Sequence, residues 1–192
     1  LLYVVYWAGG LMPNDFTSDE VTGEPANMFI HIMLLFTFLA VFVYDFIYRQ
    51  LGNLNVRVLT IISYILIGLT VYLMAYLANF EYRAYNMHIG AMFGTMMAFN
   101  VWFRIWPAQQ KIITAIKNGE APDPSALALA GLRSKHNTYM SMPLIWTMMN
   151  QHSVVFNNIF GLPSGVELMI VIAIGWHIIF QCYKIGSRVK GF

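Results

Sequence analysis

We predict that five stretches of this chain cross a lipid bilayer, and no other feature of the sequence constrains the fold as strongly. A membrane-spanning helix needs roughly 20 predominantly apolar residues. The five stretches cover residues 28–48, 56–79, 87–106, 139–156 and 166–183. A shorter one at 1–12 has the length of half a helix. The predicted fold is an all-α integral membrane protein, a bundle of five full transmembrane helices plus a partial N-terminal one.

Composition supports a membrane fold and argues against nucleic-acid binding. Hydrophobic residues make up 58% of the chain and charged residues 10%, whereas soluble proteins carry about 25% charged residues. The formal net charge is only +2, and no basic run is long enough to follow a phosphate backbone. The lipid bilayer is therefore the expected main partner, and no nucleic acid is expected.

The chain has one cysteine, Cys182, inside an apolar run. One cysteine cannot form an intramolecular disulfide, a CxxC metal pair or the CxxCH motif that attaches haem covalently. Any redox cofactor must therefore be bound non-covalently or belong to a partner. The sequence opens at Leu1 without a methionine or the features of a signal peptide, and we expect it to begin partway through a longer protein.

The basic residues predict the orientation, because cytoplasmic loops are enriched in Lys and Arg near helix ends. With alternate connections assigned to the inside, ten basic residues fall inside and Arg83 alone falls outside. The acidic loop at 15–25 is then outside, and the C-terminus is cytoplasmic. The ten inner residues are Arg49, Arg57, Arg104, Lys111, Lys117, Arg133, Lys135, Lys184, Arg188 and Lys190.

The connection at 107–136 predicts a helical hairpin lying in the cytoplasmic interface. At 109–117 three isoleucines share one face and lysines lie on the other, a pattern typical of a helix at the membrane surface. Gly119 interrupts this helix. Asp123 followed by Pro124 is a typical helix start, and it predicts a second short helix that ends near residue 132.

Three histidines are predicted at one depth near the outer boundary. His31 and His88 lie near the start of their helices and His152 near the end of another, all within about two turns of the outer end. Imidazoles at matched depth on neighbouring helices are what axial haem ligation or a metal site requires. His88 and His152 have polar neighbours and are the better candidates. The alternative for each is a histidine that only meets interfacial water.

Two other histidines stand apart from that group. His177 is predicted near mid-membrane, either as a buried residue bonded to a backbone carbonyl or as a haem or quinone ligand. His136 is predicted at the cytoplasmic surface, within the basic and amide-rich patch at 133–137. Such a patch could hold an anionic lipid headgroup or a small anionic substrate.

Two further features have structural interpretations. Gly90 and Gly94 form a GxxxG pattern, which lets a neighbouring helix approach closely. Asp45 is the one acid within a predicted transmembrane stretch, and Arg49 follows it by one helical turn. We expect the two to pair.

Four ordered blocks of the sequence resemble a known family. They cover residues 88–101, 105–111, 119–124 and 133–139. Together they are similar to the membrane domain of the bacterial membrane-bound urate oxidases. The segments at 1–10 and 43–45 resemble the same domain more loosely, so the resemblance covers most of the chain.

The resemblance implies a function. The family oxidises urate to 5-hydroxyisourate in an eight-helix membrane domain of the bacterial inner (cytoplasmic) membrane and passes the electrons to a c-type cytochrome. Residues 1–192 would then be one transmembrane domain, a fragment of that longer domain. His136 and Asn137, in the family-like block at 133–139, are the candidate catalytic residues, while His88 and His152 are the alternative proton-handling groups and the histidine that acts as base is left open. The candidate ligands of a non-covalent b-type haem are His88, His152 and His177, and His88 and His152 are also the candidate metal ligands.

Departures from the family pattern keep an alternative open. The family usually reads Asn-His-Tyr-Pro where this chain has other residues beside the histidine at 151–154, and Pro-Asn-Gln where it has Pro-Ala-Gln at 107–109. These changes favour a non-catalytic or haem-carrying accessory subunit of a larger respiratory or oxidase membrane complex. A transporter is disfavoured, because no two helices carry matching mid-membrane breaks.

Overall fold

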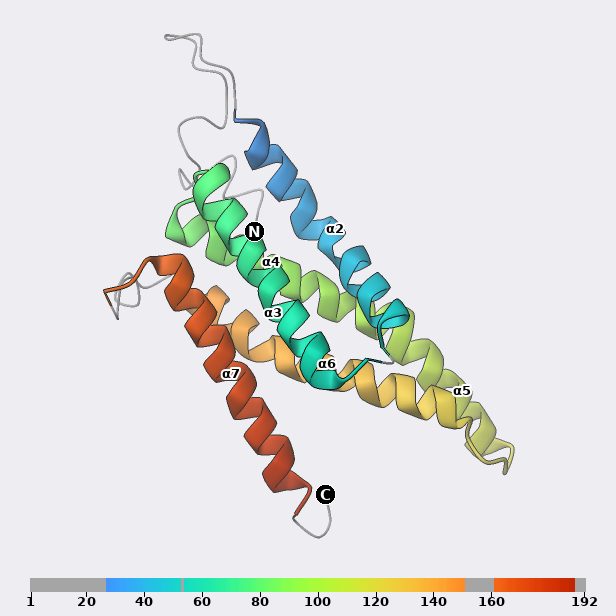
Figure 1. The fold of residues 1–192 in the computed structure, drawn as a ribbon. Helices are drawn as coiled ribbons and strands as arrows, with labels where there is room; N and C mark the ends of the chain where they lie inside the picture. The colour runs from blue at the N-terminus through green and yellow to red at the C-terminus, as the bar shows by residue number, and fades with distance from the viewer. Residues whose placement is uncertain (1–26, 53, 151–160, 189–192) are drawn as a thin grey trace, which may run out of the picture.

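The computed structural model describes residues 27–52, 54–150 and 161–188, and all regular structure within these ranges is helical. The π-helical segment η2 continues α3, and η3 joins α4 to α5, so these ranges contain five continuous helical stretches (Figure 1). The predicted all-α class is confirmed. The elements are α2 (Met28–Gln50), α3 (Val56–Tyr72), η2 (Leu73–Leu77), α4 (Tyr82–Asn100), η3 (Val101–Ile105), α5 (Trp106–Lys117), α6 (Pro124–Asn150) and α7 (Ser164–Gly186).

Three stretches of the described residues are long and apolar enough to cross a membrane: α2, α3 with η2, and α7. Their outward faces carry large exposed apolar side chains, such as Phe42 on α2, Ile65 on α3 and Phe180 on α7. Water solvates such surfaces poorly, whereas lipid tails solvate them well. The chain is therefore a membrane protein whose apolar helices contact lipid.

Helices α4 and α6 form the centre of the bundle and share its most extensive helix contact, while α2 packs on α4 and α7 on α6. Eleven residues of α4 are buried, which is more than in any other described helix. The predicted spans at 87–106 and 139–156 are helical wherever the structure describes them. Their membrane crossing stays a prediction, because these inner helices carry more polar residues than the outer three. The predicted half-helix at 1–12 lies outside the described residues.

Side chains of α6 pack tightly against α4 at Gly90. A Cβ atom added to Gly90 would lie 2.6 Å from the Met148 methyl carbon and 2.7 Å from the Thr147 hydroxyl oxygen. A Cβ atom added to Gly94 would lie 3.9 Å from Leu144, an ordinary contact. The prediction of close packing from the GxxxG pattern is confirmed, and Gly90 is the residue that permits it.

The connection at 107–136 differs from the predicted interfacial hairpin. Helix α5 runs on from α4 through η3, and the predicted second short helix is the beginning of α6, which continues without a break to Asn150. The π-helical turn ends just before Pro107. Because proline cannot donate the backbone hydrogen bond of a regular helix, a wider turn at this point lets the helix continue. The two helices thus form an antiparallel pair at one end of the bundle (Figure 1).

The turn between α5 and α6 forms as expected from its residues. Gly119 has a φ of 74°, a conformation that glycine adopts without steric cost. The Asp123 side chain accepts a hydrogen bond from the Ser125 N–H at 2.9 Å, so the predicted helix start at Pro124 is confirmed. We call the end of the bundle that carries this turn the hairpin end. The opposite end is the one where α4 begins and α6 ends.

Candidate functional site

Polar side chains from α2, α4, η3 and α6 meet toward the hairpin end of the bundle. Residues of α6 that are three and four positions apart share one helical face, and this face meets the last residue of α4. Their hydrogen bonds join them into one network, which we call the Arg133 cluster. Its members are Tyr44, Asp45, Asn100, Arg104, Arg133, His136 and Asn137.

Asp45 forms the ionic centre of the Arg133 cluster. Its Oδ1 accepts hydrogen bonds from Arg104 Nε and from Arg133 Nη2, each at 2.9 Å, and its Oδ2 accepts one from Arg104 Nη2. The expected pair with Arg49 was wrong: within the described residues Asp45 forms its salt bridges with Arg104 and Arg133. Asp45 is buried toward the neighbouring helices, whereas Arg49 is exposed.

The amide of Asn100 connects the ionic and neutral parts of the cluster. Its Oδ1 lies 3.4 Å from Arg133 Nη1, and its Nδ2 donates to the Tyr44 hydroxyl at 2.9 Å and to Asn137 Oδ1 at 2.8 Å. Asn137 Nδ2 in turn donates to the Met97 carbonyl at 3.1 Å. The Asn100 amide is therefore bonded within the cluster, and the Asn137 amide joins the cluster to the backbone of α4.

These bond directions assign the tautomer of His136. Because the Tyr44 oxygen accepts an N–H from Asn100, its own proton is directed at His136 Nδ1, which lies 2.8 Å away. His136 therefore accepts at Nδ1 and carries its proton on Nε2. Burial, together with the positive charges of Arg133 and Lys135, lowers the pKa of His136 from 6.5 to about 4. The ring is thus neutral near physiological pH.

The opposite end of the α4–α6 pair also buries polar residues, but they are uncharged. Asn86, His88 and Thr147 are fully buried, and Asn150 is 3% exposed. Asn86 Nδ2 donates to the Tyr82 carbonyl at 2.7 Å. Asn86 Oδ1 and both amide atoms of Asn150 have no hydrogen-bond partner in the described part of the chain.

The environment of His88 suits a ligand histidine. Its Nδ1 lies 2.6 Å from the Ala84 carbonyl, and a nitrogen that faces a carbonyl must carry the proton. The lone pair is then on Nε2, the arrangement in which a second hydrogen bond fixes a ligating imidazole. The ring packs against Phe80 at a centroid distance of 4.5 Å. His88 therefore has the proton arrangement that a ligating histidine requires.

The remaining predicted ligands do not join His88 in the described structure. His177 is exposed on α7, with its Nε2 3.0 Å from Gln181 Nε2, and His31 is exposed on α2. His152 lies outside the described residues. The described ranges contain no group of three or more His, Cys, Asp or Glu side chains placed to hold a metal ion. The assignments of His88, His152 and His177 stay predictions.

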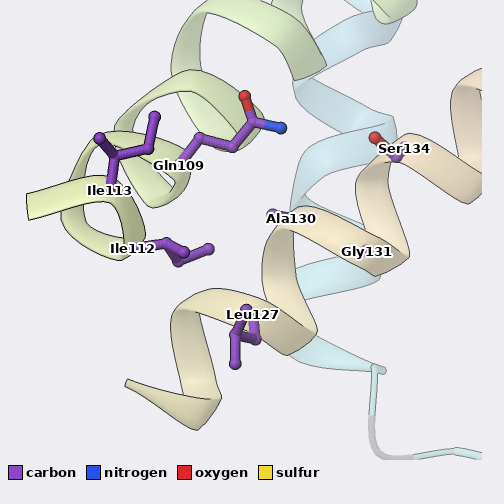
Figure 2. Close-up of a pocket in the computed structure, with 7 residues that line it drawn as sticks. All are labelled: Gln109, Ile112, Ile113, Leu127, Ala130, Gly131 and Ser134. Atoms are coloured by element: carbon purple, nitrogen blue, oxygen red, sulfur yellow. The ribbon is translucent and has the colours of Figure 1, made fainter. Parts of the chain in front are cut away.

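A cavity of about 480 Å³ lies between α5 and α6 near the turn of the hairpin. Figure 2 shows the residues that line it, contributed by both helices. Most of the lining is apolar and none of the lining residues is charged, so the cavity itself does not favour an anion. The lining residues are Gln109, Ile112, Ile113, Leu127, Ala130, Gly131 and Ser134.

The structure brings the predicted residues His136 and Asn137 into one network, and it adds partners that sequence reasoning missed. Tyr44 and Asn100 were not among the predicted site residues. A signal for both existed, since each is a hydrogen-bonding residue inside an otherwise apolar stretch, at the end predicted to be cytoplasmic. Asp45 was interpreted as a purely local pair on its own helix.

Comparison with known proteins identifies the family of the chain. The model of one protein family, urate oxidase N-terminal, matches residues 1–188. No curated protein and no solved structure matches. The family match spans nearly all of the 192 residues and contains every member of the Arg133 cluster. The chain therefore belongs to the urate oxidase N-terminal family.

Proposed function

We propose that the chain is the membrane domain of a urate-oxidising redox protein, which converts urate to 5-hydroxyisourate and passes electrons to a cytochrome. One observation carries this proposal. The family-like block at 133–137 lies in the Arg133 cluster, where a cation, a neutral imidazole and amides converge inside a membrane protein. Ionisable side chains buried in membrane proteins usually serve function, because their burial is costly.

The reaction requires both proton and electron removal. One urate monoanion and one water give one neutral 5-hydroxyisourate, one proton and two electrons. The electrons leave to a cytochrome, as in the family. The protein must therefore hold a planar anion, and it must provide an uncharged base to receive the proton.

His136 is the base in this proposal. Its pKa is lowered by burial and by Arg133 and Lys135, so the ring is neutral and able to take up a proton. The Tyr44 hydroxyl gives its proton to His136 Nδ1 and takes one from the water or substrate. Asn137 does not need to contact substrate. It holds the Asn100 amide, which orients Tyr44, and so acts as a positioning residue.

A non-covalent b-type haem is the proposed redox group, and when bound it would accept electrons one at a time. His88 would supply one ligand through Nε2, since its Nδ1 is held by Ala84. His152 and His177 are the proposed further ligands, and a metal held by His88 and His152 is the alternative to haem. We place the protein in the bacterial inner membrane, with the hairpin end and the C-terminus on the cytoplasmic side.

Activity of the purified protein tests the proposal. Urate consumption with oxidised cytochrome c as acceptor should fall by about 100-fold or more in His136→Gln, as expected for loss of a general base. His31→Gln is the matched control, because it changes an exposed histidine at the opposite end. A full rate in His136→Gln, or no urate consumption by the unaltered protein, contradicts the proposal.

Absorption spectra test the cofactor separately. A Soret band that shifts on reduction with dithionite, and that disappears in His88→Ala but persists in His31→Ala, is expected for an axial role of His88. A colourless protein that still oxidises urate removes haem from the proposal without removing the activity.

An accessory subunit is the second candidate function. It is favoured by the closed hydrogen bonding of Asn100 and Asn137, which a purely structural cluster would also have. Such a subunit would co-purify with other membrane redox subunits and would not consume urate in any combination with cytochrome c.

A further inference from the structure

The Arg133 cluster has an excess of positive charge. It contains two guanidinium groups and one carboxylate, and His136 adds no charge because its pKa is lowered. Arg104 contacts both oxygens of Asp45, whereas Arg133 contacts only Oδ1, which it shares with Arg104. The Asp45 carboxylate thus forms two of its three hydrogen bonds with Arg104, and it compensates the charge of Arg133 only partly.

Arg133 is also the more deeply buried of the two cations. Its side chain is 2% exposed, against 26% for Arg104. Of its five N–H groups, Nη2 has one short bond to Asp45 and Nη1 has one long bond of 3.4 Å to Asn100. Its Nε is buried and has no hydrogen-bond partner in the described part of the chain. A buried guanidinium with unused donors is costly unless an anion accepts from it.

The surroundings of Arg133 favour a flat ligand. Its guanidinium carbon lies 5.1 Å from the centre of the Tyr44 ring and 5.9 Å from that of Tyr48. These rings and the planar guanidinium present flat surfaces, and the His136 ring packs 4.3 Å from Tyr48. Arg104 is the more exposed of the two cations. An anion would therefore approach the cluster from the side of Arg104.

We infer that Arg133 is the binding residue for a small planar organic monoanion, which accepts a hydrogen bond from the unpartnered Arg133 Nε beside Tyr44. The patch at 133–137 left a lipid headgroup and a small anionic substrate both open, and the structure singles out Arg133 within it. Naming urate as the anion rests on the proposed function. The charge imbalance and the unpartnered Nε support an anion of this class in either case.

Direct binding without turnover tests this inference. The full chain is placed in phosphatidylcholine nanodiscs with no electron acceptor, and urate binding is measured by titration calorimetry. Arg133→Gln should weaken binding by about 30-fold or more, since the substitution removes one partner of a buried charge pair. This variant should fold, because Arg104 still compensates Asp45. Arg133→Lys keeps the charge but loses the planar fork, and an intermediate loss is expected.

Lys135→Gln is the matched control. It removes a cation from the same sequence block, but one that is exposed and lies over Tyr183. Its binding should change by less than about twofold. Equal losses in Lys135→Gln and Arg133→Gln would show only general electrostatic attraction and would overturn the inference. Hypoxanthine, a neutral purine, should bind far more weakly than urate, and equal binding would also overturn it.

Changing the nanodisc lipid distinguishes a soluble anion from an anionic lipid headgroup as the occupant of the site. Phosphatidylglycerol nanodiscs offer anionic headgroups in place of neutral ones. Urate binding that persists in phosphatidylglycerol nanodiscs supports a soluble anion. If urate binding is lost only in these nanodiscs, and phosphatidylglycerol binding depends on Arg133, the site belongs to a lipid headgroup and the inference is overturned.

Unchanged urate binding in Arg133→Gln overturns the inference but not the proposed function. Arg133-dependent binding with no urate oxidation overturns the proposed function alone, and no binding to the unaltered protein overturns the inference.

Discussion

The two ends of the α4–α6 pair bury polar residues in opposite ways. At the hairpin end, ionic groups from several helices are joined by hydrogen bonds, and Arg133 Nε is the main unpaired atom of that cluster. At the opposite end the buried polar side chains of α4 and α6 are uncharged, and amide atoms of Asn86 and Asn150 have no partner among the described residues. The buried acid near this end, Glu167, belongs to α7. The hairpin end therefore joins α2, η3 and α6 through ionic hydrogen bonds.

The largest effect is expected from Asp45→Asn. The substitution leaves two guanidinium groups without their carboxylate, and breaking a buried ion pair costs about 3–5 kcal/mol. Thermal and chemical unfolding in detergent measure the loss. Glu120→Gln changes an exposed acid of the same hairpin and should have little effect. Equal stability of the two variants would contradict an ionic role in aligning the helices.

A smaller loss is expected at Gly90, where α6 packs tightly on α4 beside the polar residues of the opposite end. Gly90→Ala forces a methyl group against Met148 and Thr147, and overpacking of this kind costs about 1–3 kcal/mol. Gly94→Ala meets only an ordinary contact with Leu144 and should be neutral or slightly stabilising. The same unfolding assay compares the two. Equal effects would mean that α4 and α6 do not approach at Gly90.

A pair of asparagine substitutions compares the two ends directly. Asn137→Leu removes the acceptor of an Asn100 N–H and one of the two donors to the Met97 carbonyl, which keeps the Val101 N–H, and should cost about 1–2 kcal/mol. Asn150→Leu removes amide atoms that have no partner in the described structure, and it should be neutral or stabilising. Unfolding midpoints of the two variants, measured under the same conditions, compare the losses of stability. A larger loss in Asn150→Leu would reverse the contrast between the ends.

Of these substitutions, His136→Gln is expected to change the free energy of unfolding least at neutral pH. The folded-state pKa of His136 is about 4, below its usual 6.5, because of burial and the charges of Arg133 and Lys135. The unfolded chain therefore binds a proton first as the pH falls, and the protein loses stability between 6.5 and about 4. Tyr44 and Tyr48 on α2 also face the ring. His136→Gln should flatten this part of the stability curve, and an unchanged slope would contradict a buried neutral histidine.

Local sequence rules predicted much of the fold. Runs of apolar residues predicted the long helices, because a helix in lipid satisfies its own backbone. Asp123 with Pro124 predicted the start of α6, and Gly90 predicted a close helix contact. The continuous α4–η3–α5 helix was not predicted, because residues 107–136 were predicted to form a separate hairpin at the membrane surface. A π-helical turn beside a proline depends on how neighbouring helices hold the chain, and single-sequence patterns do not encode that.

The candidate site shows the same division. The sequence by itself determined that Arg133, His136 and Asn137 lie close together in one family-like block and that the chain is apolar enough for a membrane, whereas the unbroken helix α6 that places them on one face was not predicted. Only the tertiary structure decided that Asp45 pairs with residues 59 and 88 positions away and that Tyr44 holds His136. A pattern along the chain fixes neighbours within one or two helical turns, whereas partners on other helices depend on the relative alignment of those helices, which packing sets.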